Sequence, residues 1–192
     1  MTTIYLVRHG EAAAGFGDHH DPGLSPRGRD QALAVAHHLA TVFADCGNDS
    51  ARLPELRCSP LRRCMETAAP IGDLLLEHRI VDPAVAEIPS PTDELSGRAA
   101  WLGDVLGSTW SSLGQRERLW RQSVLDHLRS LSRDTVVVTH FVPINIVIGE
   151  ATGSDAVTVA RCANASITVV DVVGDGSLRL VTEGEHGASE VL

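Results

Sequence analysis

A short apolar segment near the start of the chain ends abruptly in charge, and this pattern limits the folds that the chain can adopt. Ile4-Tyr5-Leu6-Val7 has the composition of a buried β-strand, and Arg8-His9-Gly10 follows it directly. Because a protein core does not tolerate unpaired charge, such a strand is expected to open onto a surface crevice. In open α/β sheets, ligands bind in crevices at the carboxyl ends of the strands. Glycine at position 10 allows a sharp turn and a close approach to a ligand.

This segment alone leaves two interpretations of its charged end. In the first, His9 is a nucleophile and Arg8 holds an anion beside it. In the second, both side chains are solvated in a surface turn. A single short motif does not decide between them, so the rest of the chain must.

Strands and helices are predicted to alternate along the chain. Ser25-Pro26 and Ser59-Pro60 each combine an N-cap residue with a proline suited to the first helical turn. The second of these helices should run toward residue 76, with Pro70 kinking or interrupting it. A further helix is expected at 115–133 and a short apolar one at 144–148. The apolar face of the first helix comprises Ala32, Val35, Ala36 and Leu39, and that of the 115–133 helix comprises Leu119, Val124, Leu128 and Leu131.

The predicted strands define the fold class. They are expected at 53–58, within 79–88 and at 135–139, with a loop over 45–52. Residues 166–173 and 177–182 are predicted to form a hairpin through Gly174-Asp175-Gly176. The alternation predicts an α/β three-layer sandwich with a mainly parallel central sheet and helices on both faces. The closing hairpin predicts an antiparallel edge strand.

The size and charge of the chain exclude several classes of protein. Its 192 residues suffice for one domain with a substantial core, and 43% hydrophobic with 21% charged residues is a globular balance. The net charge of −9 argues against a general nucleic-acid binder, so any anion site must be built from a few placed cations. We expect no membrane association and no signal peptide, because the sequence lacks the apolar stretches that these require.

The cysteines and histidines do not predict a metal site. Cys46, Cys58, Cys64 and Cys162 are scattered, which fits a reduced protein of the cytoplasm. His19-His20 and His37-His38 are adjacent pairs, and neighbours in sequence do not face one ligand from a helix or strand. Either His19 or His20 can still reach a nearby substrate.

Two further predicted strands end in the same way as the first. Ser59 follows the 53–58 strand, with Arg62 and Arg63 in the first turn of the next helix, where free backbone N–H groups favour an anion. At least one of these two arginines is expected to be merely solvated. His140 follows the 135–139 strand. Arginines and histidines gathered at one crevice suit a phosphoryl group, because guanidinium forks pair with phosphate oxygens and a neutral imidazole can attack phosphorus.

Four segments, in order over residues 4 to about 145, together resemble the histidine phosphatase superfamily, also called phosphoglycerate mutase-like. Leu6-Val7-Arg8-His9-Gly10-Glu11 is similar to its signature, and Val138-Thr139-His140 to its "V-[ST]-H" strand end. The other two segments are Asp21-Pro22-Gly23-Leu24-Ser25-Pro26-Arg27-Gly28 with Gln31-Ala32, which resembles "D-x-x-L-[ST]-x-x-G-x-x-Q-A", and Ser59-Pro60-Leu61-Arg62-Arg63-Cys64-Met65-Glu66-Thr67-Ala68, which resembles "S-P-L-x-R-[AC]-x-x-T-A".

The resemblance implies a role for each matching residue. His9 would be the phosphorylated nucleophile, Arg8 and Arg63 would clamp the phosphate, and His140 would complete the phosphate pocket. Glu87 is the best candidate for the general acid, which later activates water. Asp93 and Glu94 are the alternatives for this role, and Glu11 is not usually the acid in this family. The resemblance implies neither a metal nor an organic cofactor.

The leading prediction is a metal-independent phosphomonoesterase that acts on a small phosphorylated metabolite. A phosphohistidine protein phosphatase is an alternative, although such relatives tend to lack the acid that Glu87 supplies. A phosphoglycerate mutase is another, although family mutases are longer than this chain. A phospho-ligand sensor on the same fold is the non-enzymatic alternative, although the nucleophile and arginines that such proteins usually lose are present.

Residues 89–112 are predicted to be an excursion from the single domain of residues 1–192, close to the active site. In the family, this region tends to shape the pocket for the leaving group. Arg98, Trp101 and Trp110 either hold substrate there or pack the excursion onto the core. The sequence indicates neither the particular substrate nor the oligomeric state.

Overall fold

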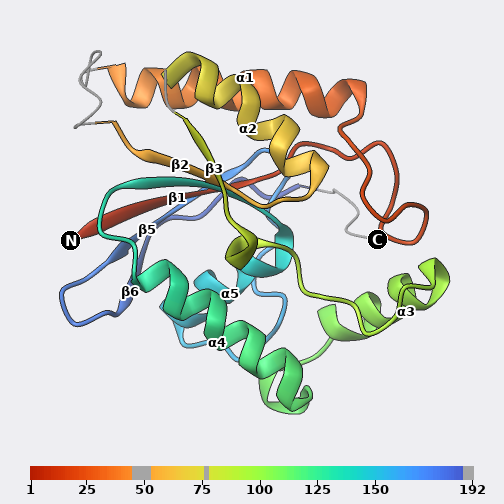
Figure 1. The fold of residues 1–192 in the computed structure, drawn as a ribbon. Helices are drawn as coiled ribbons and strands as arrows, with labels where there is room; N and C mark the ends of the chain where they lie inside the picture. The colour runs from red at the N-terminus through yellow and green to blue at the C-terminus, as the bar shows by residue number, and fades with distance from the viewer. Residues whose placement is uncertain (45–52, 76–77, 188–192) are drawn as a thin grey trace.

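The computed structural model describes residues 1–44, 53–75 and 78–187, so the loop predicted for 45–52 and Cys46 lie outside the described residues. Strands and helices alternate along the chain (Figure 1). The strands are β1 (Thr2–Arg8), β2 (Glu55–Cys58), β3 (Arg79–Val81), β4 (Thr135–Thr139), β5 (Ile167–Val172) and β6 (Leu178–Thr182). The α-helices are α1 (Pro26–Val42), α2 (Arg62–Leu75), α3 (Leu95–Leu106), α4 (Gln115–Arg129) and α5 (Phe141–Thr152), and the 3₁₀ turns are η2 (Pro83–Val85) and η3 (Trp110–Ser112).

The strands form one sheet in the order β3-β2-β4-β1-β5-β6. The first four in this order are parallel, whereas β5 runs antiparallel to β1 and β6 antiparallel to β5. Gly176, with φ at 81°, closes the hairpin between β5 and β6 in a conformation that favours glycine. The predicted α/β sandwich and its closing hairpin are therefore confirmed.

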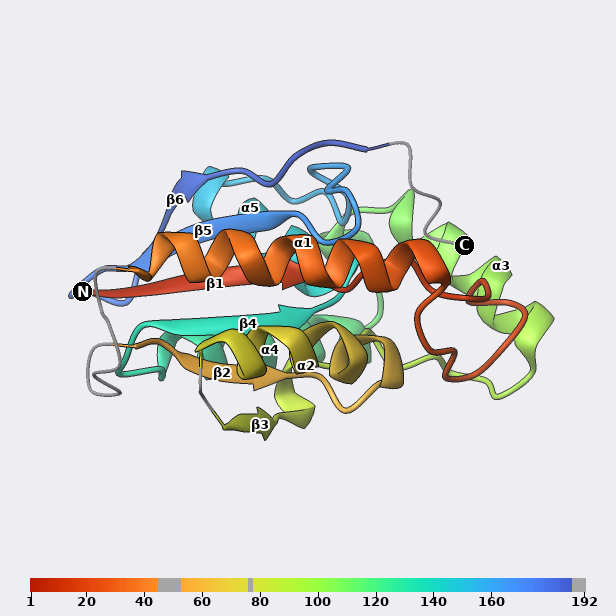
Figure 2. The ribbon, with the colours of Figure 1, turned by 90° about the horizontal axis from the view of Figure 1, so that it is seen from above.

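Helices cover both faces of the sheet. Seen from above, α1 and α2 lie over the strands, and α4 and α5 lie beneath them (Figures 1 and 2). Each face of the sheet carries its own apolar core, one around Leu39, Ile71 and Val138 and the other around Leu125, Ile146 and Val170. The helices thus hold the sheet from both sides and leave the ends of the strands to the loops.

Helix α1 follows the sequence prediction. Ser25 is its N-cap, with Oγ accepting a hydrogen bond from the Gly28 amide at 2.9 Å, and Pro26 is the first helical residue. The predicted apolar face is buried: Ala32, Val35, Ala36 and Leu39 are each at most 5% exposed.

Helix α2 differs from the prediction in where it begins and in not being interrupted at Pro70. It begins at Arg62 rather than at Ser59-Pro60, and the Arg62 amide donates to Asp21 Oδ1 at 2.8 Å. It also continues through Pro70 without interruption, and Ala68 and Ile71, which lie near the proline, are fully buried in one core. This packing favours a continuous helix although Pro70 lacks an N–H donor.

Three other elements differ from their predicted limits. Strand β3 has three residues and ends before Asp82, which starts η2, so Glu87 lies beyond a 3₁₀ turn rather than at a strand end. Helix α4 ends at Arg129, and its Leu119 is 62% exposed, because the buried face is formed by Val124, Leu125 and Leu128. Helix α5 is longer than predicted, since it starts directly after His140.

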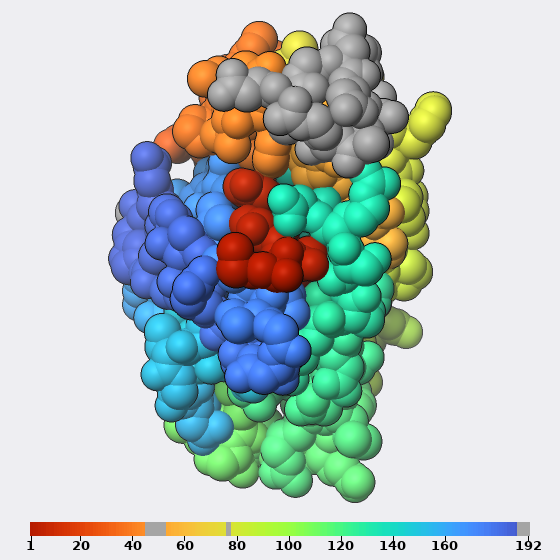
Figure 3. Space-filling view, turned by 90° about the vertical axis from the view of Figure 1, so that its left-hand side faces the viewer, coloured from red at the N-terminus to blue at the C-terminus, as the bar shows by residue number. Residues whose placement is uncertain are grey.

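The chain begins at the surface, at the amino end of the sheet, where Met1 is 84% exposed. Figure 3 shows the first residues of the chain between the blue hairpin and the teal segment that precedes β4. There the Thr3 amide donates to Asp134 Oδ1, and the Thr3 hydroxyl donates to Asp171 Oδ1, each at 2.8 Å.

None of the helices in the described parts of the chain is long and apolar enough to cross a membrane.

Candidate active site

The carboxyl ends of three adjacent strands bring the predicted residues together. Strand β4 lies between β1 and β2 in the sheet. The His9 amide donates to the Thr139 carbonyl, and the Ser59 amide to the Val138 carbonyl, each at 3.0 Å. These bonds continue the strand pairing just beyond the strand ends, and so they place His9, Ser59 and His140 at one edge of the sheet.

Gly10 lies at a close approach between two parts of the chain. A Cβ at Gly10 would lie 2.5 Å from the Gly28 carbonyl oxygen, and a Cβ at Gly28 would lie 2.0 Å from the Glu11 carbonyl oxygen. The φ angle of Gly10 is not in the left-handed region. The glycine therefore lets the start of α1 pack onto the loop after β1, and the close approach is between two parts of the chain.

The His9 ring is held in one tautomer. Its Nδ1 lies 2.7 Å from the Gly10 carbonyl oxygen, which can only accept, so Nδ1 carries the proton. Nε2 then presents a lone pair, which accepts from Arg63 Nε at 3.2 Å. Burial, together with the positive charges of Arg63 and Arg8, holds the pKa of His9 well below its ordinary value. The ring is therefore neutral at physiological pH.

Arg63 bridges the two predicted histidines. Besides its bond to His9, its Nη2 lies 3.1 Å from Nδ1 of His140. Since a guanidinium only donates, His140 Nδ1 accepts and its proton is on Nε2, 2.7 Å from Ser59 Oγ. Burial, followed by the charge of Arg63, holds the pKa of His140 well below its ordinary value. The two rings pack edge to face, with centroids 5.2 Å apart.

Arg8 is buried beside this pair. Its Nη1 donates to the Cys162 carbonyl at 2.6 Å, and its guanidinium lies 5.1 Å from the centroid of the Phe141 ring. Burial lowers the pKa of Arg8 to about 10, a value at which it stays charged at physiological pH. Two buried cations, Arg8 and Arg63, are thus held close to a neutral imidazole lone pair.

Glu87 faces the same cations. Burial raises the pKa of its carboxyl group, and the Ile88 amide and the charges of Arg63 and Arg8 only partly oppose this effect. The Ile88 amide donates to Glu87 Oε1 at 3.0 Å. A carboxyl group with a raised pKa has the property that a general acid needs.

A cavity of about 520 Å³ opens over these groups. Arg8, His9, Arg63 and Glu87 line it, whereas His140 is completely buried behind Arg63 and is not among its lining residues. The remaining walls mix apolar residues with polar ones, including Phe16, Leu102, Phe141, Glu11, His19, Arg27, Gln31 and Asn164.

The family model of the histidine phosphatase superfamily (branch 1) matches residues 4–183. The chain belongs to this superfamily. Family membership identifies it as a phosphatase, in agreement with the prediction from its motifs. No curated protein matches the chain significantly in sequence.

Solved structures share the fold of this histidine phosphatase. YhfR of Bacillus stearothermophilus is 22% identical, with a TM-score of 0.73 over 97% of this chain and 98% of its own. Phosphoserine phosphatase of Entamoeba histolytica, in complex with 3-phosphoglyceric acid, is 23% identical, with a TM-score of 0.66 and full coverage of both chains. Mycobacterial glucosyl-3-phosphoglycerate phosphatase, in a VO3 complex, is 20% identical, with a TM-score of 0.64 over 95% and 99%.

The two adjacent arginines of the histidine phosphatase differ in environment. Arg63 is 6% exposed and lines the cavity, whereas the Arg62 side chain is 67% exposed and pairs with Glu66 at 2.7 Å. The expectation that one of them is solvated is confirmed. At the start of α2, where an anion was expected, the Arg62 amide donates to the carboxylate of Asp21 at 2.8 Å.

Several predicted residues lie away from the cavity. Asp93 and Glu94 are exposed on the described excursion and are not among the lining residues, whereas Glu11 lines the cavity and accepts from Ser25 Oγ at 2.7 Å. Trp110 is buried in the core, and the partly buried Trp101 packs against the same core cluster. Arg98 stacks on Phe16 at 4.4 Å from the ring centroid, so it reaches the cavity wall only through Phe16.

Three residues make contacts at the site that were not predicted. Asn164 Nδ2 donates to the His9 carbonyl at 3.1 Å, and Thr67 Oγ1 accepts from the Gly10 amide at 3.0 Å. Ser59 was placed at the crevice without a role, and it contacts His140. Thr67 falls within a family motif, which was a usable signal, whereas Asn164 lies in an irregular segment far along the chain and carries no pattern.

Proposed function

We propose that this chain is a phosphomonoesterase that transfers the phosphoryl group of its substrate to Nε2 of His9 and then to water. The observation that carries the proposal is the tautomer of His9. Its Nδ1–H is engaged by the Gly10 carbonyl, so the lone pair on Nε2 is directed to the guanidinium of Arg63 in the cavity. A neutral, oriented imidazole beside buried arginines suits attack on phosphorus.

The first step forms a bond between His9 Nε2 and phosphorus, while the bond from phosphorus to the leaving oxygen breaks. Arg63 shifts its N–H donors from the ring nitrogens to the phosphoryl oxygens, and Arg8 adds charge. The Gly10 carbonyl stabilises Nδ1–H as positive charge develops on the ring. Glu87, whose raised pKa favours the protonated form, donates its proton to the leaving oxygen.

The second step reverses these roles. A water molecule attacks phosphorus, its proton passes to Glu87, and the nitrogen–phosphorus bond breaks to release phosphate and neutral His9. We propose that His140 supports both steps by holding Arg63, and that it reaches the phosphoryl group once Arg63 has moved. We also propose that no divalent metal is needed, since two arginines supply positive charge of the kind that metals supply elsewhere.

We propose a small phosphate ester as the substrate. Glu87 favours an ester over a phosphoramidate, because an ester oxygen needs a proton to leave. The apolar walls of Phe16, Leu102 and Phe141 suit a small organic leaving group, with residues 89–112 forming one side of a single domain. The names of the structural neighbours direct the first assays to phosphoserine, 3-phosphoglycerate and glucosyl-3-phosphoglycerate. We also propose a cytoplasmic location, supported by the three buried free thiols of the described residues, Cys58, Cys64 and Cys162.

The proposal is tested by measuring phosphate release from these esters and from an aryl phosphate, with a chelator present. We expect one ester to be hydrolysed efficiently and His9→Ala to lose that activity by about 10⁴-fold or more. Interconversion of phosphoglycerates without phosphate release would instead indicate a mutase. Full activity of His9→Ala would contradict the mechanism.

A further inference from the structure

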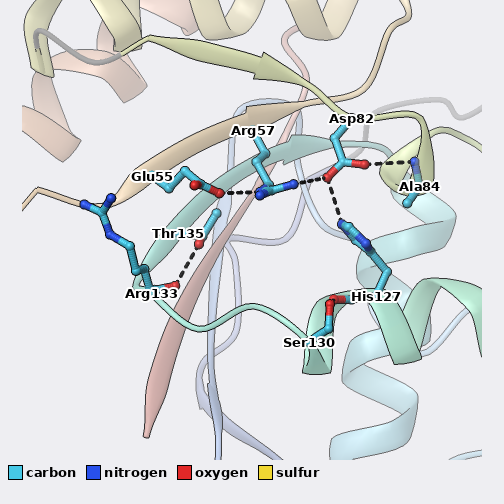
Figure 4. Close-up of polar contacts among 8 residues, drawn as sticks. All are labelled: Glu55, Arg57, Asp82, Ala84, His127, Ser130, Arg133 and Thr135. Carbon is cyan, nitrogen blue, oxygen red and sulfur yellow. Dashed lines mark hydrogen bonds and ion pairs between the residues drawn. The ribbon is translucent and has the colours of Figure 1, made fainter.

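A second cluster of charged residues lies outside the cavity, between the sheet and α4. Its centre is Asp82, which follows β3 and is 6% exposed. Asp82 Oδ2 accepts from Arg57 Nη1 at 2.9 Å and lies 2.8 Å from His127 Nε2, and Oδ1 accepts from the Ala84 amide at 3.1 Å (Figure 4). The carboxylate thus joins β2, the turn η2 and α4.

The cluster fixes the backbone as well as the side chain of Asp82. The Asp82 amide donates to the Cys58 carbonyl at 2.8 Å, and the Asp82 carbonyl accepts from the Val85 amide at 3.3 Å. Arg57 is itself held by Glu55 on the same strand. Burial raises the pKa of Asp82, but the hydrogen bonds from Arg57, the Ala84 amide and His127 outweigh it, so the pKa falls below its ordinary value. Asp82 is therefore an ionised anchor.

The anchored segment leads directly to Glu87. After Asp82, the Val85 carbonyl accepts from Thr139 Oγ1 at 2.6 Å, and Thr139 is the residue before His140. Val85 and Ile88, on either side of Glu87, are at most 2% exposed. Further along, Arg116 Nη2 donates to the Pro89 carbonyl at 3.2 Å. Polar bonds and two apolar side chains therefore fix this segment.

Glu87 needs such anchors because it lies outside regular structure. In the part of the chain that the structure describes, residues 86–94 contain neither helix nor strand. A backbone ladder therefore does not set the position of the Glu87 carboxyl group. Proton transfer to a leaving oxygen requires hydrogen-bond distance, so a small displacement of this segment would cost catalysis.

We propose that Asp82, held by Arg57 and His127, is a positioning residue that places the Glu87 carboxyl group for proton transfer to the leaving group. This inference rests on the general-acid role of Glu87 in the proposed function. Asp82 touches neither the cavity nor the reacting atoms, and it acts through the segment 82–88.

A merely structural role would give a different result from a positioning role. Protonation matters most when the leaving group is a poor one, such as an alkoxide, and least for a nitrophenolate, which leaves without a proton. Loss of a positioned acid therefore lowers kcat/KM for alkyl phosphates far more than for nitrophenyl phosphate. Partial unfolding lowers both by the same factor.

The experiment compares Asp82→Asn with Glu87→Gln and with Asp171→Asn on the two kinds of phosphate. Asp171 is a matched control, because it is 5% exposed and bound by Arg179 and Thr3, on a strand at the other side of the sheet. His127→Ala is a milder second variant in case Asp82→Asn does not fold. The measured quantity is kcat/KM, which reports only the steps up to release of the first product.

For Asp82→Asn, we expect a loss of about 10-fold or more on the alkyl phosphate and less than about 3-fold on nitrophenyl phosphate. Glu87→Gln should show the same pattern more strongly, His127→Ala should show it more weakly, and Asp171→Asn should lose neither activity selectively. Equal losses on both substrates, or no loss, for Asp82→Asn and His127→Ala would overturn the positioning role if Glu87→Gln remains selective. If Glu87→Gln is not selective, the proposed acid itself fails, and the inference falls with it.

Discussion

Arg57 and Arg63 stand on either side of the end of β2 and have opposite surroundings. Arg57 donates to the carboxylates of Glu55 and Asp82, so its charge is neutralised. Arg63 donates to ring nitrogens of His9 and His140, both neutral, and no salt bridge in the described part of the chain includes it. The first arginine stabilises the fold, whereas the second is buried at a cost that an anionic substrate would offset.

The largest effect of these substitutions should come from removing the charge of Arg63, which has no carboxylate partner among the described residues. Arg63→Met keeps the length of the side chain and removes its donors. We expect kcat/KM for nitrophenyl phosphate to fall by about 10²–10³-fold, because one charged donor to the phosphoryl group is lost. The free energy of unfolding in urea should not fall. A variant that unfolds more easily while keeping its activity would contradict the comparison.

Substituting Arg57 by methionine should have the reverse effect, a loss of stability with little loss of activity. Arg57→Met leaves the buried Asp82 carboxylate without its arginine partner, so we expect the free energy of unfolding to fall by about 1–3 kcal/mol. Activity on nitrophenyl phosphate should stay within about threefold, since this leaving group does not need the acid. Urea unfolding and steady-state kinetics on one preparation measure both quantities. Unchanged stability would show that Arg57 is not the structural partner of Asp82.

The buried histidines should make the protein sensitive to acid. Burial and neighbouring cations hold the pKa of His9 and His140 well below the ordinary value of about 6.5. As pH falls below that value, the unfolded chain binds protons that the folded chain does not, so the free energy of unfolding falls.

This dependence can be assigned by substitution. His140→Gln should flatten the profile between pH 7 and pH 5 by on the order of 1 kcal/mol. His38→Gln, on the exposed face of α1, is the control substitution. Urea titrations at several pH values measure both slopes. Equal slopes for wild type and His140→Gln would mean that folding does not lower the pKa of His140.

The smallest effect is expected from substituting Arg62, the neighbour of Arg63 in the sequence. Arg62 adjoins Arg63 but is exposed and pairs with Glu66 across one helical turn. Arg62→Ala should change the free energy of unfolding by less than about 0.5 kcal/mol, as is usual for exposed pairs, and activity by less than about twofold. A loss comparable to that of Arg63→Met would show that the cation acts through long-range charge rather than through contact.

Local patterns predicted much of the fold and of the candidate site. The strand from Ile4 to Val7, the Ser25 cap and the limits of β4 depend on neighbouring residues, and they were predicted correctly. The resemblance to the family selected Arg63 over Arg62, which the structure separates by burial.

Long-range contacts were not predictable in this way. Asp82 lies between a short strand and Pro83, a pattern typical of any loop. Its partner His127 is far away in the sequence, on α4, yet its Nε2 lies 2.8 Å from the Asp82 carboxylate. Asn164 supports His9 across most of the chain length. Leu119 fits the apolar stripe of α4, but the side of the helix that faces the core is the one with Leu125. The Leu119 side chain is therefore exposed. Only the assembled sheet and helices determine these distances.

The central claim is that His9 carries the phosphoryl group during turnover. The most direct measurement is the intact mass of the enzyme, quenched in alkali a few milliseconds after mixing with nitrophenyl phosphate, because phosphohistidine survives alkali and is lost in acid. We predict one added phosphoryl group, mapped to His9, which disappears on acid treatment and does not form in His9→Ala. Turnover by the wild-type enzyme with a phosphoryl group on another residue, or with an equal amount of it in His9→Ala, would contradict the account.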